Sequence, residues 1–443
     1  MQKRETMNKT HWLLAFALWL LAMGMQAQPV FDIIKKSPGY ASCNYDVYPD
    51  DVPNLLTPPP SGKRPFYISH YGRHGSRYIN KRSGYEIPYK MMVQANGVRE
   101  LTSTGKRVFS EMNLILEDSE DRWGDLTALG RTQHRQIARR MFNRFPEVFV
   151  DSACVSGRST VVPRCILSME AALIELAQLN PRLNITIDAS KSTQWYMNYQ
   201  DPILRQSDLR PEAQKAYDAY IASRVGNSRL MELLFKNPDI IKELVDETFF
   251  NYYLMKMGLF QLNTHLNKDT YLTDLFTTED LYRMWQIDNV QWYLQYGFCP
   301  LNGGDYPYSQ RHLLRQIIAD ADSCFRLSHP GAQLRFGHET VLLPLVCLLG
   351  INGYDLRTSD LDEIEKKGWW CSSVFPMGAN VQFIFYRRDK KDKDVLFKVL
   401  LNEQEAKLPI FTDCAPYYHW RDFRRYCLNK LDRYEKRVKK ENK

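Results

Sequence analysis

The alternation of apolar and polar positions along the chain predicts two kinds of element. Short apolar runs rich in β-branched and aromatic residues are typical of buried strands. They lie at 66–71, 149–156, 333–337, 381–386 and 395–402. Apolar residues repeated every three or four positions predict helices, and these stretches lie at 127–145, 170–179, 313–321 and 339–349. Together the two patterns indicate an α/β core.

The pattern changes between about 192 and 299, where strand signals are almost absent. The positions 240, 241, 244, 245 and 249 are apolar at helical spacing, and tryptophan and tyrosine are frequent. We interpret this region as an all-helical subdomain that covers one side of a site in the core. The predicted division is a signal peptide (1–27), an irregular arm (28–62), the α/β core (63–191 and 300–420), a helical cap (192–299) and a basic C-terminal helix (421–443).

The N-terminus has the layout of a secretory signal. Basic residues precede an apolar run, Trp12–Met25, and Ala27 marks a small-residue cleavage site. The run is shorter than the ~20 residues that a membrane-spanning helix needs. We therefore predict an exported protein, periplasmic or extracellular, with no integral membrane span.

The formal net charge of +8 is concentrated at the two ends of the chain. Met1–Ala27 carries +2 and Arg421–Lys443 carries +6, so the body between them is neutral. A general nucleic-acid-binding surface is not indicated, because such surfaces need a large basic excess. Any preference for a polyanion must therefore come from a local pocket. We expect the protein to act as a monomer.

The nine cysteines do not form a recognisable framework. Their odd number leaves at least one unpaired within a monomer, although an exported chain can form disulfides. No Cys-x-x-Cys pair occurs, and Cys165 and Cys347 lie in apolar helical stretches that suit a small buried thiol. Structural zinc is therefore not expected.

The most informative stretch follows the first predicted strand. Gly72 and Gly75 flank His74, and Arg73 and Arg77 stand on either side of it. Glycine allows a tight backbone path and a close approach to a ligand. Two guanidiniums beside an imidazole suit a tetrahedral oxyanion such as phosphate, which arginine binds bidentately. On spacing alone, a basic surface turn is an equally good interpretation.

The segment Arg73–Arg77 resembles the Arg-His-Gly-x-Arg signature of the histidine acid phosphatase branch of the histidine phosphatase superfamily. Tyr78 is similar to the residue found at this place in multiple inositol polyphosphate phosphatases and phytase-type members. Many of these have proline next, where this chain has Ile79.

A second segment, about 260 residues further on, completes the resemblance. Residues 336–340 read Phe-Gly-His-Glu-Thr, where family members have His-Asp or His-Ala-Glu. Here Glu339 directly follows His338. The chain therefore has the glutamate of the His-Ala-Glu pattern at the adjacent spacing of the His-Asp pattern. The Leu-Thr-x-x-Gly pattern at 126–130 also occurs in the family, with a packing role. Of the two arginines that follow the strand near 150, we expect Arg158 to hold its own turn and Arg164, at a helix start, to meet the anion.

The resemblance covers nearly the whole mature chain and implies both a fold and a reaction. The fold would be a three-layer α/β sandwich with a mixed, mainly parallel central sheet and an inserted helical subdomain. His74 would be the nucleophile that forms a phosphohistidine, and Glu339 would be the general acid. The phosphoryl group would be held by Arg73, Arg77, Arg164 and His338, with no metal and no other cofactor.

The expected substrate is a small phosphorylated molecule, first of all an inositol polyphosphate such as phytate. Lys81 and Arg82 are candidates for meeting its additional phosphates, or else form a solvated basic turn. A broad-specificity acid phosphatase is the main alternative. A metallophosphatase built on His70 and His74, a phosphoryl mutase and a non-catalytic inositol-phosphate-binding protein are further alternatives.

Overall fold

The computed structural model describes residues 30–204, 209–224, 229–243, 246–327 and 331–441. The predicted signal peptide lies outside these residues. Within the described ranges, no helix combines the length and the apolar character needed to cross a membrane.

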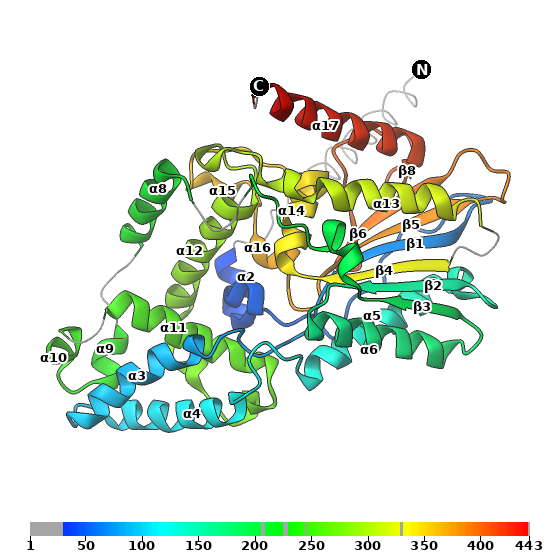
Figure 1. The fold of residues 1–443 in the computed structure, drawn as a ribbon. Coiled ribbons are helices and arrows are strands. Elements are labelled where there is room, and N and C mark those ends of the chain that lie inside the picture. The colour runs from blue at the N-terminus through cyan, green and yellow to red at the C-terminus, as the bar shows by residue number, and fades with distance from the viewer. Residues whose placement is uncertain (1–29, 205–208, 225–228, 244–245, 328–330, 442–443) are drawn as a thin grey trace, which may run out of the picture.

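A single mixed sheet forms the centre of the core (Figure 1). Its order is β3-β2-β4-β1-β5-β6-β7, and β8 pairs with β6. The first four strands in this order are mutually parallel, whereas β5, β6 and β7 join by antiparallel pairing. The strands are β1 (Arg64–Arg73), β2 (Cys154–Ser159), β3 (Asn184–Asp188), β4 (Gly331–Gly337), β5 (Asn380–Arg387), β6 (Leu396–Leu401), β7 (Gln404–Ala406) and β8 (Tyr418–His419). The predicted α/β fold with a mixed sheet is confirmed.

Helices cover both faces of this sheet (Figure 1). On one face, α5 (Ala128–Arg144) and α6 (Pro163–Leu179) pack against alternate strand residues such as Ile68 and Ile384. On the other face, α13 (Arg311–Cys324), α14 (Glu339–Leu349) and α17 (Trp420–Glu441) pack against the intervening residues, including Tyr67 and Phe385. Every residue of β5, and every residue of β1 after Arg64, is buried. Because successive strand side chains point to opposite faces, this burial indicates a sheet covered on both sides.

The register of the parallel strands brings distant residues to one edge. Arg73, at the end of β1, lies opposite Gly337 at the end of β4, and Ser159 of β2 lies opposite Phe336. The loops that follow these three strands therefore meet at the carboxyl edge, where α/β proteins commonly bind ligands.

A helical region lies beside the sheet. It includes the short helices α9 (Arg229–Leu234) and α10 (Pro238–Lys242), and the longer helices α8 (Pro211–Ala222), α11 (Glu247–Phe260) and α12 (Thr278–Tyr296). The short helix α7 (Gln194–Met197), which the predicted cap includes, packs instead on α13, over the sheet. The helices α3 (Ser83–Gly97) and α4 (Ser103–Ser119) also belong to the helical region, because Met92 and Met112 share an apolar cluster with Leu230 and Leu254. The predicted cap, 192–299, therefore omits two helices that the sequence analysis assigned to the core.

The remaining elements are short. The arm predicted to be irregular contains α2 (Val30–Lys36), whose Val30 and Ile34 are buried, and a 3-10 helix, η1. Two small helices, α15 (Glu363–Lys366) and α16 (Cys371–Val374), precede β5. The 3-10 helices are η1 (Pro38–Tyr45), η2 (Pro146–Phe149), η3 (Lys191–Thr193), η4 (Gln261–Asn263), η5 (His265–Lys268), η6 (Leu272–Leu275), η7 (Pro300–Asn302), η8 (Tyr306–Gln310) and η9 (Ile351–Gly353).

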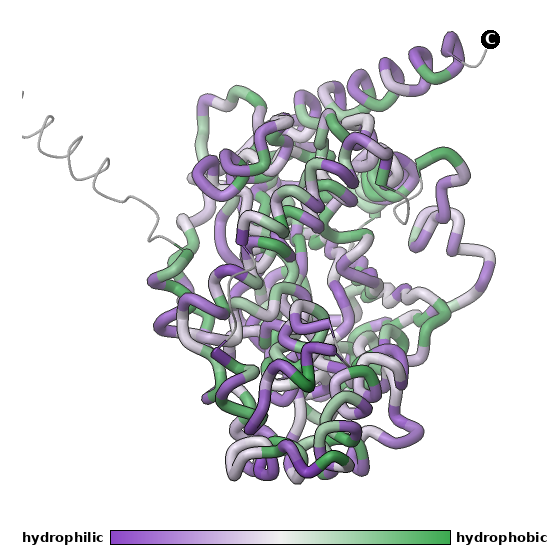
Figure 2. The backbone as a smooth tube through the Cα atoms, turned by 90° about the vertical axis from the view of Figure 1, so that its left-hand side faces the viewer, coloured by the Kyte–Doolittle hydropathy of each residue, from purple (hydrophilic) through white to green (hydrophobic). Residues whose placement is uncertain are grey.

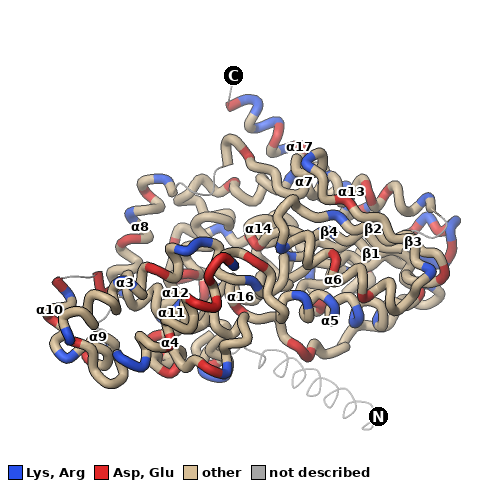
Figure 3. The backbone as a smooth tube through the Cα atoms, turned by 60° about the horizontal axis from the view of Figure 1, so that its bottom comes forward, with Lys and Arg blue, Asp and Glu red and all other residues tan. Residues whose placement is uncertain are grey.

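The C-terminal helix α17 is amphipathic. Phe423, Cys427, Leu431 and Tyr434 are buried at helical spacing, and hydrophobic and hydrophilic residues alternate along the helix in Figure 2. Its exposed side carries both basic and acidic residues (Figure 3). The predicted basic C-terminal helix (421–443) is thus stabilised by packing of its apolar face against the body of the protein.

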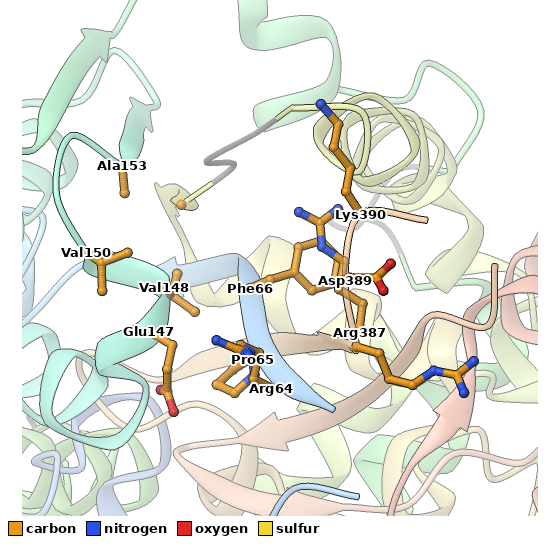
Figure 4. Close-up of a pocket in the computed structure, with 12 residues that line it drawn as sticks. Arg64, Pro65, Phe66, Glu147, Val148, Val150, Ala153, Arg387, Asp389 and Lys390 are labelled. Atoms are coloured by element: carbon orange, nitrogen blue, oxygen red, sulfur yellow. The ribbon is translucent and has the colours of Figure 1, made fainter. Parts of the chain in front are cut away.

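One cavity, of about 470 Å³, lies at the start of β1 and is lined by Arg64, Pro65, Val148 and Arg387, among others (Figure 4). Arg387 donates to the Phe325 carbonyl oxygen and lies over the Phe66 ring. At a rise of about 3.3 Å per residue, the ten-residue strand β1 separates this cavity from Arg73 by roughly 30 Å. The cavity is therefore remote from the carboxyl edge.

Candidate active site

The loop after β1 is fixed by backbone hydrogen bonds to two neighbouring segments. The His74 amide donates to the Gly337 carbonyl oxygen over 2.9 Å, and the Gly378 amide donates to the His74 carbonyl oxygen over 2.9 Å. The Arg73 amide likewise donates to the Ala379 carbonyl oxygen over 2.7 Å. His74, the candidate nucleophile, thus lies between the C-terminal end of β4 and the segment that leads into β5.

The same loop packs on the first turn of α5 through two glycines. A Cβ added to Gly75 would come closer than 3.0 Å to three backbone atoms of Gly130, and a Cβ on Gly130 would lie 2.8 Å from the Ser76 amide nitrogen. Thr127 caps α5 by accepting from the Gly130 amide, and its hydroxyl donates to the Ser76 carbonyl oxygen. Thr127 is thus the N-cap residue of α5, and the Leu-Thr-x-x-Gly pattern is explained by this close backbone contact.

The His74 imidazole is buried and oriented. Its Nδ1 lies 2.9 Å from the Gly75 carbonyl oxygen, and because a carbonyl only accepts, Nδ1 carries the proton. Nε2 is then left with a lone pair and, within the described residues, has no hydrogen-bond partner. Burial lowers the pKa of His74 well below its ordinary value, and the neighbouring Arg73 and Arg164 lower it further. His74 is therefore neutral, with a lone pair on Nε2 that is chemically suited to nucleophilic attack.

Three arginines converge beside this nitrogen. Arg73 is fully buried and is held by the carbonyl oxygens of Phe375 and Asn44, at 2.5 and 2.7 Å. Arg77 is also buried, and its Nη1 donates to the Tyr78 carbonyl oxygen. Arg164 is half-buried in the first turn of α6, and its Nε has no partner among the described residues. Burial, followed by repulsion from Arg77, lowers the pKa of Arg164.

The second motif supplies the remaining groups at the start of α14. His338 is the N-cap residue; its Nε2 lies 3.2 Å from the Thr160 hydroxyl, and its ring centroid is 5.8 Å from that of His74. Glu339 is the first residue of the helix. Its carboxylate lies 3.2 Å from Arg73 Nε, 3.5 Å from His74 Nε2 and 3.8 Å from Arg77.

All six site residues named from the sequence thus lie at one place. Two guanidiniums, those of Arg73 and Arg77, lie within 4 Å of the Glu339 carboxylate, and Arg164 is close enough to interact with it electrostatically. Three positive charges against one negative charge leave an excess suited to an anion. Burial alone would raise the pKa of Glu339, but attraction to Arg73 and Arg77 holds it well below its ordinary value. The carboxyl group is therefore ionised in this state. The atoms of His74, His338 and Glu339 are also close enough to share a metal ion, but the arginines disfavour a cation there.

Other residues considered from the sequence lie outside this cluster. His70 is buried inside β1, with its ring 5.4 Å from that of Phe336, and it belongs to no metal-capable group among the described residues. Arg158 does more than hold its own turn, since it lies 3.4 Å from Asp320 of α13. Arg82 is exposed and pairs with Glu86 and Glu120.

Several residues that shape the site carry no recognisable sequence signal. Asn44 holds Arg73 through a backbone carbonyl, which any residue offers, and the Tyr45 ring lies 5.1 Å from the Arg77 guanidinium. Cys165 lies 3.8 Å from His338 and donates to the Gly337 carbonyl oxygen. The position of η1 against the site could be found only from tertiary structure.

We predict that the folded protein loses stability in mild acid because three histidines are buried in neutral form. Burial lowers the pKa of His70 to about 3 and those of His134 and His338 to about 4. The unfolded chain takes up protons below pH ~6.5, so stability falls as the pH drops from there towards about 4, by about 2 kcal/mol per histidine at pH 5. Urea unfolding at pH 7.5 and pH 5 measures this loss. In His134→Gln the fall in the free energy of unfolding between pH 7.5 and pH 5 should be smaller than in wild type, whereas in His265→Gln, at an exposed position, it should be unchanged. An equal fall in the two variants would contradict the prediction.

The sequence comparisons agree with this geometry. Residues 72–402 match the family model of the histidine phosphatase superfamily, branch 2. This match spans well over half of the chain, and the chain therefore belongs to that family. The sequence has no significant match among curated proteins.

Solved structures show the same fold at low sequence identity. The multiple inositol polyphosphate phosphatase of Bifidobacterium longum, in complex with inositol hexasulfate, is 16% identical with a TM-score of 0.68, over 86% of this chain and 96% of that one. The phytase from D. castellii is 14% identical with a TM-score of 0.67, over 89% of this chain and 85% of that one. Hafnia alvei phytase is 15% identical with a TM-score of 0.50, over 84% and 98%.

Proposed function

We propose that the protein hydrolyses phosphomonoesters through a phosphohistidine on His74. The observation that carries the proposal is the buried Nε2 of His74. It has no hydrogen-bond partner among the described residues and lies 3.5 Å from the Glu339 carboxylate, beside three arginines. A neutral imidazole is a good nucleophile, and preorganised cations stabilise charge on the phosphoryl oxygens as the bond to the leaving group breaks.

In the first step, His74 Nε2 attacks phosphorus and the bond from phosphorus to the ester oxygen breaks. The departing oxygen needs a proton, and Glu339 is the donor in this proposal. Its carboxyl group is ionised without substrate, but a bound phosphoryl dianion would engage Arg73 and Arg77 and add negative charge. Both effects raise the pKa of Glu339, so substrate binding itself favours the protonated acid.

In the second step, water attacks phosphorus, the bond to Nε2 breaks and inorganic phosphate leaves. Glu339, ionised after the first step, takes the proton from water. His338, held by Thr160, and Arg164, in the first turn of α6, stabilise the phosphoryl oxygens. No step in this scheme uses a metal ion.

We further propose an inositol polyphosphate as the substrate. The fold similarity to a multiple inositol polyphosphate phosphatase and a phytase supports this, as does the Phe-Gly-His-Glu-Thr motif at 336–340. A broad-specificity acid phosphatase is the alternative. One observation favours it: Arg82, a candidate for meeting additional phosphates, is already paired with Glu86 and Glu120.

Assays of the purified protein on phytate and on a small aryl phosphate, with and without EDTA, distinguish these proposals. We expect kcat/KM to be at least about tenfold higher on phytate, since its additional phosphates offer binding energy that an aryl group lacks. EDTA should leave the activity unchanged. Higher efficiency on the aryl ester would refute the inositol substrate, and complete loss with EDTA would refute the metal-free mechanism.

A further inference from the structure

A second cluster of potential ligands lies at the opposite edge of the sheet from His74. Strand pairing aligns His419 of β8 with Leu396 at the start of β6, Leu396 with Tyr386, and Tyr386 with Pro65 at the start of β1. Next to His419, the loop before β8 presents Asp413 and Cys414. Ligand atoms of these three residues all lie within 4.8 Å of one another.

The imidazole of His419 is held in one orientation by a carboxylate. Its Nδ1 lies 2.6 Å from Asp394 Oδ1, so the other nitrogen, Nε2, points at Asp413 Oδ1, 3.0 Å away, and at Cys414 Sγ, 4.0 Å away. A carboxylate that holds the remote nitrogen of a histidine is the usual outer partner of a metal-ligating imidazole. The backbone pairing of β8 with β6 fixes the same residue without any ion.

The three groups match the preferences of zinc. Zinc binds imidazole nitrogen, thiolate sulfur and carboxylate oxygen at about 2.0–2.3 Å, so a tetrahedral ion holds its ligand atoms roughly 3.5 Å apart. The observed separations of 3.0 and 4.0 Å lie on either side of that value. Side-chain shifts of about 0.5 Å would bring these two separations to that value, and Asp413 can move because its side chain is 71% exposed.

The local charge also suits a cation here, in contrast to the active site. The two aspartates carry negative charge, and a bound cation would favour the thiolate of Cys414. Lys63 lies 3.7 Å from Asp394 but is shared with Asp392, at 2.8 Å. At the group formed by His74, His338 and Glu339, by comparison, three arginines repel a cation.

We propose that Asp413, Cys414 and His419 bind a zinc-type divalent cation, with Asp394 positioning the histidine and water completing the coordination. Such an ion would tie the loop before β8 to the residue directly preceding α17. The role is structural, because the cluster lies at the edge of the sheet remote from His74.

Cobalt spectroscopy on tag-free, full-length protein tests the proposal. After metal removal, Co²⁺ should produce a thiolate-to-cobalt charge-transfer band and the visible bands of a tetrahedral site. Both should disappear in Cys414→Ser and in His419→Ala. They should remain in Cys154→Ser, which changes an exposed cysteine elsewhere. Asp394→Asn should weaken Zn²⁺ affinity about 10–100-fold, as expected for an outer partner.

Thermal unfolding of the metal-free proteins shows whether each variant folds. Added Zn²⁺ should raise the melting temperature of wild type and Cys154→Ser, and should not raise that of Cys414→Ser or His419→Ala. Phosphatase activity should be unchanged by removal of the ion. Three results would overturn the proposal: no Zn²⁺ bound by wild type, a cobalt spectrum without a thiolate band, or equal affinity in wild type and Cys414→Ser. A cobalt spectrum without a thiolate band would instead fit His419 as an imidazolium ion between Asp394 and Asp413, or an ion bound by His74, His338 and Glu339.

Discussion

Replacing His74 with alanine should lower kcat/KM by about 10⁴-fold or more, the scale seen when a covalent nucleophile is removed from a hydrolase. The arginines and Glu339 would remain, so substrate would still bind, but no group would replace the attacking Nε2. Steady-state assays on phytate and an aryl phosphate measure the effect.

The matched control is His265→Ala, since the side chain of His265 is 68% exposed and lies in the helical region. It should retain wild-type activity. If His74→Ala retained activity within about tenfold of wild type, with either substrate, the covalent mechanism would be wrong. Far-ultraviolet circular dichroism confirms that both variants are folded.

Gly130→Ala should strongly destabilise the protein, although alanine is normally the better helix former by up to ~1 kcal/mol. The added Cβ would lie 2.8 Å from the Ser76 amide nitrogen and 2.7 Å from Leu126, and backbone cannot move aside as a flexible side chain can. We expect a loss of about 3 kcal/mol in the free energy of unfolding, at the upper end of the range for overpacking. Since Ser76 belongs to the catalytic loop, activity should fall as well.

Urea unfolding of Gly130→Ala and Gly97→Ala provides the comparison. Gly97 is the last residue of α3, and an added Cβ there meets nothing within 4 Å. Gly97→Ala should therefore be neutral or slightly stabilising. Equal stability of the two variants would show that the contact between Gly130 and the loop at 75–76 does not constrain the fold.

The sequence predicts much of the site because its parts follow strand ends. Buried strands were evident from apolar runs, and parallel strands bring their carboxyl ends to one edge, so Arg73 and Gly337 lie opposite each other. Apolar periodicity predicts the helix only over 170–179, whereas its start at Arg164 is what the family resemblance implies. Pairing the motif at 73–77 with that at 338–339 depended on the family resemblance, since periodicity says nothing of which distant segments meet.

Other features depend on tertiary contacts that local patterns do not encode. The apolar faces of α3 and α4 have ordinary helical spacing, and only packing decides that they bury against α9 and α11. The carbonyl of Asn44 holds Arg73 through backbone, whose chemistry is the same for every residue. Likewise, the ligands of the proposed zinc site include one cysteine, so a search for paired cysteines passes over them.

The central claim is a covalent bond between phosphorus and His74 Nε2, and trapping that bond tests it most directly. Protein mixed rapidly with phosphate-labelled substrate is quenched in alkali, which preserves phosphohistidine, and its peptides are mapped. We predict label on the peptide that contains His74, and none in His74→Ala protein. Turnover at the normal rate with no label on that peptide, or label on another residue, would contradict the mechanism.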